Sequence, residues 1–193
     1  MNLLAVSPES DYADEAACLV RLFENGLRRY HLRKPGWTAD QTAGFIGQLP
    51  GDLQSRISIH QHHELADTFP VGRHHKEGAG VILTKPTAPA AVSRSLHTLS
   101  RLEDACQGMD YVFLSPVFPS ISKPGYAPDE SFAALRSVLS NEHSANVYAL
   151  GGLDINNFEE ALELGFDGVV LHGALWQSAD PVKVLAQFGR VAA

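Results

Sequence analysis

The chain has 193 residues, of which 45% are hydrophobic and 19% are charged, and its formal net charge is −7. This composition excludes a generally disordered chain, because it supplies enough apolar side chains for a buried core. The negative charge excludes a protein that binds nucleic acid or an anionic membrane through its overall electrostatic field. The length is that of a single domain, residues 1–193.

The N-terminal residues and the two cysteines indicate the compartment. Four acidic residues precede the first basic residue, Arg21, which is not the pattern of a secretory signal. Cys18 and Cys106 lack CxxC spacing, so we expect free thiols rather than a disulfide or a thiolate zinc site. No apolar run reaches the ~18–20 residues that cross a bilayer. We therefore expect a cytoplasmic protein without a membrane segment.

Short apolar or β-branched runs alternate with amphipathic stretches along the chain, which is typical of βα units around a parallel sheet. Eight strands are expected, at residues 3–7, 29–33, 56–60, 71–75, 92–96, 110–117, 146–151 and 167–172. Helices are expected at residues 14–25, 38–48, 99–106, 130–139, 155–164 and 182–191. This order predicts a small (βα)8 TIM barrel. The alternative is an open doubly wound sheet, although no GxGxxG motif follows the first strand.

Local signals set some of the helix boundaries. Thr38 and Gln41 have the spacing of a capping box at the start of one helix. Asp154 is the expected N-cap of the helix that follows the seventh strand. The fourth crossover, residues 76–91, contains two prolines that push the preceding residues away from helical conformation. We expect its helix to be missing or reduced.

Active sites of TIM barrels lie at the C-terminal ends of the strands, so the polar residues there are the candidates. At the end of the second strand, His31 and Arg33 project to the same side by the period-two rule. Arg33 offers phosphate a planar fork of donors, and Lys34 adds a point charge from the loop. Arg33 and Lys34 are therefore candidate phosphate ligands.

The loops after the last three strands also carry anion-binding residue types. Ser120, Ser122 and Lys123 lie in a proline-rich loop after the sixth strand, where hydroxyls and a cation can surround oxygen acceptors. Glycines after the seventh and eighth strands let backbone N–H groups approach a ligand, at the recurrent phosphate site of this architecture. The cradle residues expected there are Gly151, Gly152, His172 and Gly173.

Nine histidines leave a metallohydrolase barrel as an alternative. His60 and His62, at alternating positions near a strand end, would be the start of its metal site. Near the strand ends there are few carboxylate or cysteine ligands, and few groups that could accept a hydrogen bond from the second ring nitrogen of a metal-bound histidine. We therefore assign no metal ligands from the sequence.

Seven segments, taken in order, resemble the thiamine phosphate synthase superfamily, which includes the thiazole tautomerases. They are HLRKP (31–35), RISIHQHHELA (56–66), GRHH (72–75), SLHTLSRLEDA (95–105), DYVFLSPVFPSISKPG (110–125), ALGGL (149–153) and GFDGVVLHGAL (165–175). The resemblance implies a TIM barrel, often dimeric. Its synthase members join a hydroxymethylpyrimidine diphosphate to a thiazole phosphate and release pyrophosphate.

By the same resemblance, the diphosphate would be held by Arg33, Lys123, Ser120 and Ser122. Ser95 would lie near the pyrimidine or the diphosphate, and the glycine cradle would hold the thiazole phosphate. Synthases that resemble this chain carry magnesium carboxylates after the third and fourth strands. Here those positions are His60-Gln61 and the region of Gly78 and Ala79. The cofactor is therefore unknown, and would be Mg²⁺ only in a true synthase.

Tautomerase members transfer a proton on a thiazole carboxylate phosphate without a metal, using a histidine at the end of the sixth strand. That position is Pro116 here, so another base would be needed, and the candidates are His31, His60 and His97. We expect a synthase-like transferase in thiamine biosynthesis, with Arg33, Lys123, His31 and His60 as catalytic residues. The expected partners are a small phosphorylated heterocycle and a second copy of the chain. A tautomerase and a catalytically silent phosphate-ligand binder are the alternatives.

Overall fold

Eight parallel strands pair in sequence order and close into a barrel in the computed structural model, which describes residues 2–79, 90–119 and 130–191. Strands β1 and β8 form the closing pair, with Leu3 beside Val169. The strands are β1 (Asn2–Val6), β2 (Arg29–Leu32), β3 (Ile57–Ile59), β4 (Gly72–His75), β5 (Val92–Leu96), β6 (Tyr111–Leu114), β7 (Asn146–Leu150) and β8 (Gly168–Leu171). The predicted TIM barrel is confirmed. The open-sheet alternative is wrong, because an open sheet has two unpaired edge strands, whereas β1 and β8 pair with each other here.

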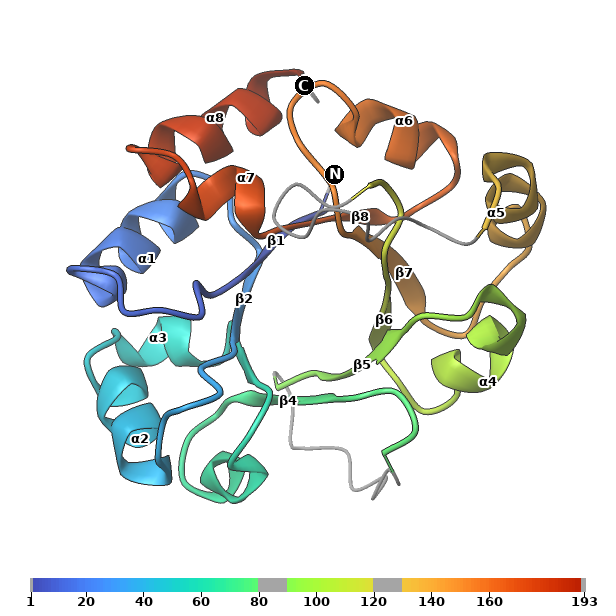
Figure 1. Cartoon of the computed structure of the whole chain (residues 1–193). Helices are drawn as coiled ribbons and strands as arrows, with labels where there is room; N and C mark the ends of the chain where they lie inside the picture. Colours follow the sequence, from blue (N-terminus) through green and yellow to red (C-terminus); the bar gives the residue numbers. More distant parts are fainter. Residues whose placement is uncertain (1, 80–89, 120–129, 192–193) are drawn as a thin grey trace.

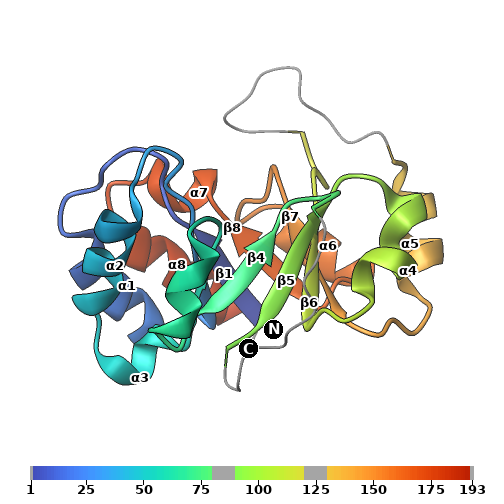
Figure 2. The same ribbon diagram turned by 90° about the horizontal axis from the view of Figure 1, so that it is seen from below.

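The helices lie outside the barrel, as Figure 1 shows along the barrel axis and Figure 2 from the side. The α-helices among the described residues are α1 (Glu15–Glu24), α2 (Ala39–Gly47), α3 (Gly51–Gln54), α4 (Leu102–Cys106), α5 (Phe132–Leu139), α6 (Phe158–Glu163), α7 (Gly173–Trp176) and α8 (Pro181–Val191). The 3-10 helices are η1 (His63–Asp67) and η2 (Leu99–Arg101). Because the strands are parallel, their C-terminal ends meet at one rim, which we call the mouth.

The predicted capping box of α2 is present. The Gln41 N–H donates to Thr38 Oγ1 over 3.2 Å, and the Thr38 N–H donates to Gln41 Oε1 over 2.9 Å. Asp154 is not the N-cap of α6, because its carboxylate accepts from the Asn156 N–H and closes a turn instead. The helix therefore begins later than expected, at Phe158, with Asn157 in the N-cap position.

The crossover between β4 and β5 has no helix within its described residues, 76–79 and 90–91. The expected reduction of the fourth crossover helix stays a prediction, because residues 80–89 lie outside the described part of the chain. The two proline steps that motivated the expectation, Lys85-Pro86 and Ala88-Pro89, lie outside the described residues. The helix predicted at 99–106 is present over the same residues, with its first turn in 3-10 form as η2 and the remainder as α4.

The inside of the barrel has an apolar half and a polar half. Strands β1, β6, β7 and β8 contribute one buried cluster of apolar and aromatic side chains: Leu4, Val6, Tyr111, Phe113, Tyr148 and Val170. Strands β2 to β5 contribute buried polar side chains instead: His31, Ser58, His74 and Ser93. A buried polar group is costly unless it is hydrogen-bonded, so the polar half requires a partner for each of these groups.

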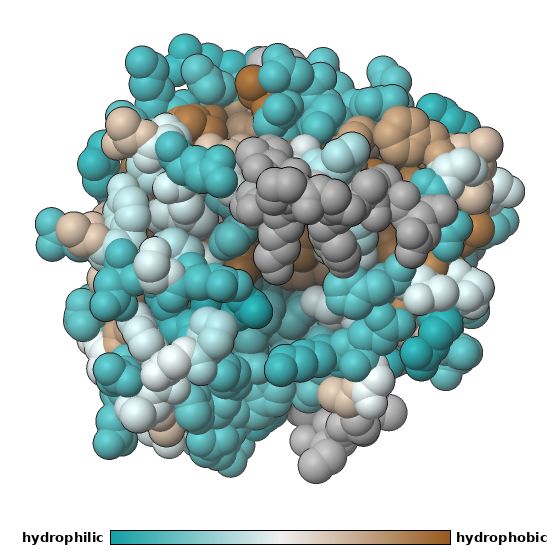
Figure 3. All heavy atoms as spheres, viewed as in Figure 1, coloured by the Kyte–Doolittle hydropathy of each residue, from teal (hydrophilic) through white to brown (hydrophobic). Residues whose placement is uncertain are grey.

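The face seen along the barrel axis is largely hydrophilic (Figure 3), and the two cysteines form no disulfide. Among the described helices, none combines the length and the hydropathy that crossing a bilayer requires. Cys18 is half-buried and Cys106 is buried, and both are free thiols, as predicted.

Candidate functional site

Arg33 lies at the mouth directly after β2, as the sequence predicted. Its side chain is partly exposed and its guanidinium forms an ion pair with Glu9, which lies in the loop after β1. The Arg33 backbone N–H also donates to Ser7 Oγ over 2.8 Å, which ties the ends of β1 and β2 together. Arg33 is therefore available to an anion, in competition with an exposed carboxylate.

Lys34 is not the exposed loop charge that the sequence predicted. Its side chain is 1% exposed, and Nζ lies 2.6 Å from Glu15 Oε2 and 2.9 Å from the Ser10 carbonyl oxygen. The other Glu15 oxygen accepts from the Tyr30 hydroxyl over 2.6 Å. The ammonium also lies 5.2 Å from the centre of the Trp37 ring. Lys34 therefore binds a buried carboxylate between β2 and α1, and we withdraw it as a substrate ligand.

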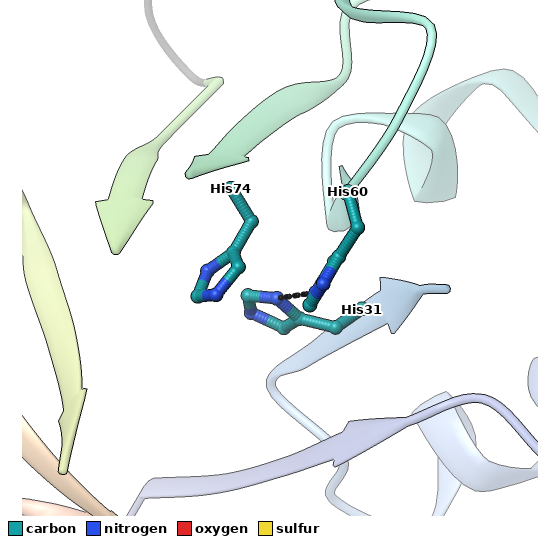
Figure 4. A group of neighbouring side chains, drawn as sticks. All are labelled: His31, His60 and His74. Atoms are coloured by element: carbon teal, nitrogen blue, oxygen red, sulfur yellow. Dashed lines mark hydrogen bonds between the residues drawn. The ribbon is translucent and has the colours of Figure 1, made fainter. Parts of the chain in front are cut away.

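Three histidines from neighbouring strands meet inside the mouth. His31 lies in β2, His74 lies in β4, and His60 directly follows β3. One nitrogen from each ring lies within 4.8 Å of the others, and Figure 4 shows the rings turned toward one another. The rings of His60 and His74 are stacked with centres 4.1 Å apart. We call this group the histidine cluster.

Hydrogen bonds fix two rings of the cluster. His31 Nε2 lies 2.8 Å from the Tyr111 hydroxyl, and His31 Nδ1 lies 3.0 Å from His60 Nε2. The two nitrogens of His74 each lie 2.8 Å from a hydroxyl of β5, Nδ1 from Ser93 and Nε2 from Ser95. These side chains supply the partners that the polar half of the barrel requires.

Burial keeps the cluster neutral at physiological pH. Loss of hydration lowers the pKa of His31 and of His74 well below the ordinary value of 6.5, and the neighbouring histidines lower it further. Burial also lowers the pKa of His60 to about 3, with a contribution from the positive charge of Arg33. Neutral imidazole can accept a proton or bind a metal, and it does not offer a positive charge to phosphate.

Other predicted residues are distributed around the mouth. Ser95, in β5, contacts His74 as described above. His97 is exposed just after β5. Its ring Nδ1 lies 2.8 Å from the Ser115 carbonyl oxygen, and its backbone N–H donates to the carboxylate of Glu77. His172 is half-buried and connects β8 to α7. Ser120, Ser122 and Lys123 lie outside the described residues.

The glycines after β7 and β8 lie at the same rim as Arg33, as expected. Gly151 has a φ of 97° and Gly152 a φ of 67°, and Gly173 is the first residue of α7. The Gly151 carbonyl accepts from the Phe118 N–H, and the Gly152 carbonyl accepts from Asn157 Nδ2. These bonds hold the turn in place beside the end of β6. The role of the turn in phosphate binding remains a prediction.

Gly152 also has a packing reason to be glycine. A Cβ there would lie 2.4 Å from the Pro119 carbonyl oxygen and 2.6 Å from that of Phe118, and both are backbone atoms. We expect Gly152→Ala to lower the free energy of unfolding by about 1–3 kcal/mol, because of overpacking and a left-handed φ. Urea denaturation measures this loss. The control is Gly44→Ala in α2, where a Cβ meets nothing within 4 Å and should not destabilise.

Two cavities lie away from the histidine cluster, between the loop after β1 and helix α2. One has a volume of about 540 Å³ and is lined by Tyr12, Glu15, Trp37 and Phe45 among others. The second, of about 760 Å³, adjoins it and includes Glu9. None of the described residues that line either cavity is lysine or arginine, so these cavities do not suit a phosphate group. The mouth of the barrel is the better candidate site.

Sequence reasoning included Ser95 but missed His74 and the hydroxyl of Ser93, which both bond in the cluster. It paired His60 with His62, but His62 has a left-handed backbone and its ring bonds to the Trp37 carbonyl oxygen. A usable signal was present, because period-two alternation along β2 and β4 turns His31 and His74 inward. Adjacent strands then place these inward residues near one another, whereas residues close in sequence need not be close in the site.

The family model and the curated relatives agree on one family. The sequence model of that family, described as thiamine monophosphate synthase, matches residues 3–175. A thiamine-phosphate synthase of Listeria welshimeri is 29% identical over 123 residues, which are 63% of this chain and 59% of the relative. A putative thiamine-phosphate synthase of Geobacter sulfurreducens is 33% identical over 114 residues, or 53% of each chain. The match thus spans less than two thirds of the length of these curated relatives.

Two solved structures with the same fold carry related names. Thiamine phosphate pyrophosphorylase from Bacteroides thetaiotaomicron superposes with a TM-score of 0.81 at 26% identity, covering 100% of this chain and 98% of the other. Thiamine phosphate pyrophosphorylase from Pyrococcus furiosus gives a TM-score of 0.80 at 19% identity, covering 98% of this chain and 94% of the other. The second similarity supports the fold alone.

Proposed function

Because the chain belongs to the thiamine monophosphate synthase family, we propose that it joins a hydroxymethylpyrimidine diphosphate to a thiazole phosphate and releases pyrophosphate. The observation that carries this proposal is the family match over residues 3–175, which includes all eight strands and the loops at the mouth. The relatives reported above are named as synthases or pyrophosphorylases, so they do not favour the tautomerase alternative.

The proposed reaction demands stabilisation of a leaving pyrophosphate and positioning of a nucleophile, with little acid–base chemistry. Arg33 is the described cation that fits the first demand, because its partly exposed guanidinium can exchange Glu9 for a phosphate oxygen. We propose that Lys123, Ser120 and Ser122 act with it. The proposed phosphate cradle for the thiazole substrate consists of Gly151, Gly152, His172 and Gly173.

Ser95 and His97 are proposed to contact the pyrimidine, because β5 brings both to the mouth. The buried position of His31, with both ring nitrogens already in hydrogen bonds, argues against direct contact with a substrate. His60 is half-buried and lies nearer to the mouth, so it is the member of the cluster that a substrate would reach first.

The residues near the ends of β3 and β4 do not fit Mg²⁺, which the family resemblance implies. Mg²⁺ prefers octahedral oxygen ligands, usually including carboxylates. His60 and Gln61 follow β3, and the carboxylate of Glu77 after β4 already accepts from the His97 N–H and lies 3.4 Å from Arg101 Nη1. Glu64 is exposed beside His62. We therefore derive no catalytic step through Mg²⁺.

The activity is tested with the purified full chain and both substrates. Release of pyrophosphate together with formation of thiamine phosphate would support the proposal. The reaction should be run in three conditions: with a metal chelator, with Mg²⁺, and with Zn²⁺. Absence of product in all three would overturn the proposed activity, and substrate binding without turnover would indicate a silent binder.

Arg33→Gln tests the proposed role of the guanidinium. We expect kcat to fall about 10²–10³-fold, because one preorganised donor to the developing anion is lost. Stability should change by less than about 1 kcal/mol, since the pair with Glu9 is exposed. Steady-state kinetics of pyrophosphate release give the ratio. Arg190→Gln, at the exposed end of α8, is the matched control and should retain full activity.

We also propose a cytoplasmic location and a homodimer. The free thiols of Cys18 and Cys106 support a reducing compartment. The dimer follows from the family resemblance, and sedimentation of the purified chain tests it: a monomer at micromolar concentration would exclude a stable dimer.

A further inference from the structure

We infer that His31, His60 and His74 form a binding site for a divalent d-block cation, with Zn²⁺ as the expected ion. Each ring offers one nitrogen, and the three nitrogens lie within 4.8 Å of one another. At the usual Zn–N distance of about 2.0–2.1 Å, tetrahedral geometry places ligand nitrogens roughly 3.3 Å apart. His31 Nδ1 and His60 Nε2 are already 3.0 Å apart. Small ring movements would therefore complete a three-histidine site.

The surrounding hydroxyls select which nitrogens face the ion. Metal-bound histidines usually donate the other ring N–H to a fixed acceptor. His31 has such an acceptor in the Tyr111 hydroxyl at Nε2, which leaves Nδ1 for the metal. His74 has one in Ser93 Oγ at Nδ1, which leaves Nε2. Both acceptors are buried, so these two ligands are oriented before an ion binds.

Besides these ring movements, ion binding requires a change of tautomer at His60. If the His31 ring donates from Nε2 to Tyr111, the hydrogen bond between His31 Nδ1 and His60 Nε2 uses the proton of His60. Moving the proton of His60 from Nε2 to Nδ1, while His31 keeps its proton on Nε2, leaves both facing nitrogens with lone pairs. The three imidazoles stay neutral and no proton is lost. Because burial already keeps all three rings unprotonated, protons do not compete strongly for the site.

The site is closed toward the barrel interior and open toward the mouth. His31 is fully buried and His74 is 1% exposed, whereas His60 is half-buried at the end of β3. Three protein ligands with an accessible fourth position are the pattern of a catalytic rather than a structural zinc site. Ser95 Oγ, 2.8 Å from His74 Nε2, lies where it must either move aside or bind the ion. Arg33, near His60, favours an anion or an anionic oxygen as the fourth ligand.

The donor set identifies the class of ion. Three neutral imidazole nitrogens suit Zn²⁺, Co²⁺, Ni²⁺ and Cu²⁺, and do not suit Mg²⁺ or Ca²⁺, which prefer oxygen. The inference does not rest on the proposed synthase activity, because it concerns binding of the ion without substrate. A failed synthase assay and a failed metal titration are therefore separate results.

The test is titration of the chelator-treated full chain with Co²⁺, followed by competition with Zn²⁺. We expect one Co²⁺ per chain, with the visible absorption of a four- or five-coordinate nitrogen site, and displacement by one equivalent of Zn²⁺. A Co²⁺ spectrum equal to that of the hydrated ion, together with no binding of Zn²⁺ by calorimetry, would overturn the inference. This measurement uses the unaltered protein and does not depend on whether a variant folds.

Variants then locate the site. His60→Gln and His74→Gln should each abolish the Co²⁺ band. Ser93→Ala should weaken binding about 10–100-fold, because it removes the acceptor that orients His74. His75→Gln is the matched control, since His75 neighbours His74 in β4 but points to the other face of the strand, and its band should be unchanged. Loss of the band in His75→Gln and its retention in His74→Gln, with both variants folded by circular dichroism, would overturn the assignment.

Discussion

Lys34→Met is expected to lower the free energy of unfolding by about 3–5 kcal/mol, which is a large fraction of the stability of a domain. The variant leaves the carboxylate of Glu15 buried, with the hydroxyl of Tyr30 as its remaining hydrogen-bond donor among the contacts described. An uncompensated buried charge is costly, because the protein interior does not replace the hydration that the carboxylate has lost. Urea denaturation at neutral pH measures the change.

A neighbouring ion pair supplies the control for this prediction. Arg33 and Glu9 are adjacent to the buried pair, but their side chains are 41% and 55% exposed, so Arg33→Met should cost less than about 1 kcal/mol. The double variant Glu15→Gln with Lys34→Met should recover most of the loss, because it removes the unpaired charge and keeps an acceptor for the Tyr30 hydroxyl. Equal effects of Arg33→Met and Lys34→Met would contradict the buried-pair account.

The barrel could be predicted from the sequence because its signals are local and repeated. Most strands are short β-branched or apolar runs, although β4 is not, and the capping box at Thr38 marks a helix start by spacing alone. The predictions fail where the same local sequence pattern is compatible with two different structures. Asp154 has the side chain of an N-cap, but the same carboxylate can close a turn, and that turn delays the start of α6 to Phe158.

The site was less predictable, because its chemistry depends on contacts between distant parts of the chain. Lys34 and Arg33 are adjacent basic residues, yet Lys34 meets Glu15 of α1 inside the protein and Arg33 meets Glu9 at the surface. Sequence alone does not distinguish these outcomes. The histidine cluster likewise joins residues 31, 60 and 74, and its His31–Tyr111 hydrogen bond joins residues 80 positions apart. The register of four strands decides which of these side chains meet.

The apolar half of the barrel interior contributes tight packing, whereas the polar half contains the buried histidines. The aromatic and apolar side chains of β1, β6, β7 and β8 pack against one another, and the hydroxyl of Tyr111 links them to the polar half through His31. The polar half depends on hydrogen bonds in which each histidine remains neutral. This dependence makes the polar half sensitive to pH, whereas the apolar half is not.

Acid is therefore expected to destabilise the metal-free protein steeply. Burial sets the pKa of His60 to about 3, and those of His31 and His74 lie well below 6.5, whereas the same groups titrate near 6.5 in the unfolded chain. Below pH 6.5 the unfolded chain binds more protons than the native state, so stability falls as pH falls and is retained above pH 6.5. A histidine that stays neutral in the native state contributes about 1.4 kcal/mol per pH unit below the pKa of the unfolded chain, so stability should fall steeply between pH 6.5 and pH 5.

Urea denaturation at several pH values, in the presence of a metal chelator, measures this slope. Carboxylates elsewhere also respond to acid, so the decisive quantity is the difference between two chains. His74→Gln removes one of the three buried titrating groups and should reduce the cluster's contribution to the slope by about a third, whatever its effect on stability at pH 7. If the unaltered chain and His74→Gln lose stability in parallel from pH 7 to pH 5, then His74 is protonated in the native barrel, and the neutral hydrogen-bonded cluster is wrong.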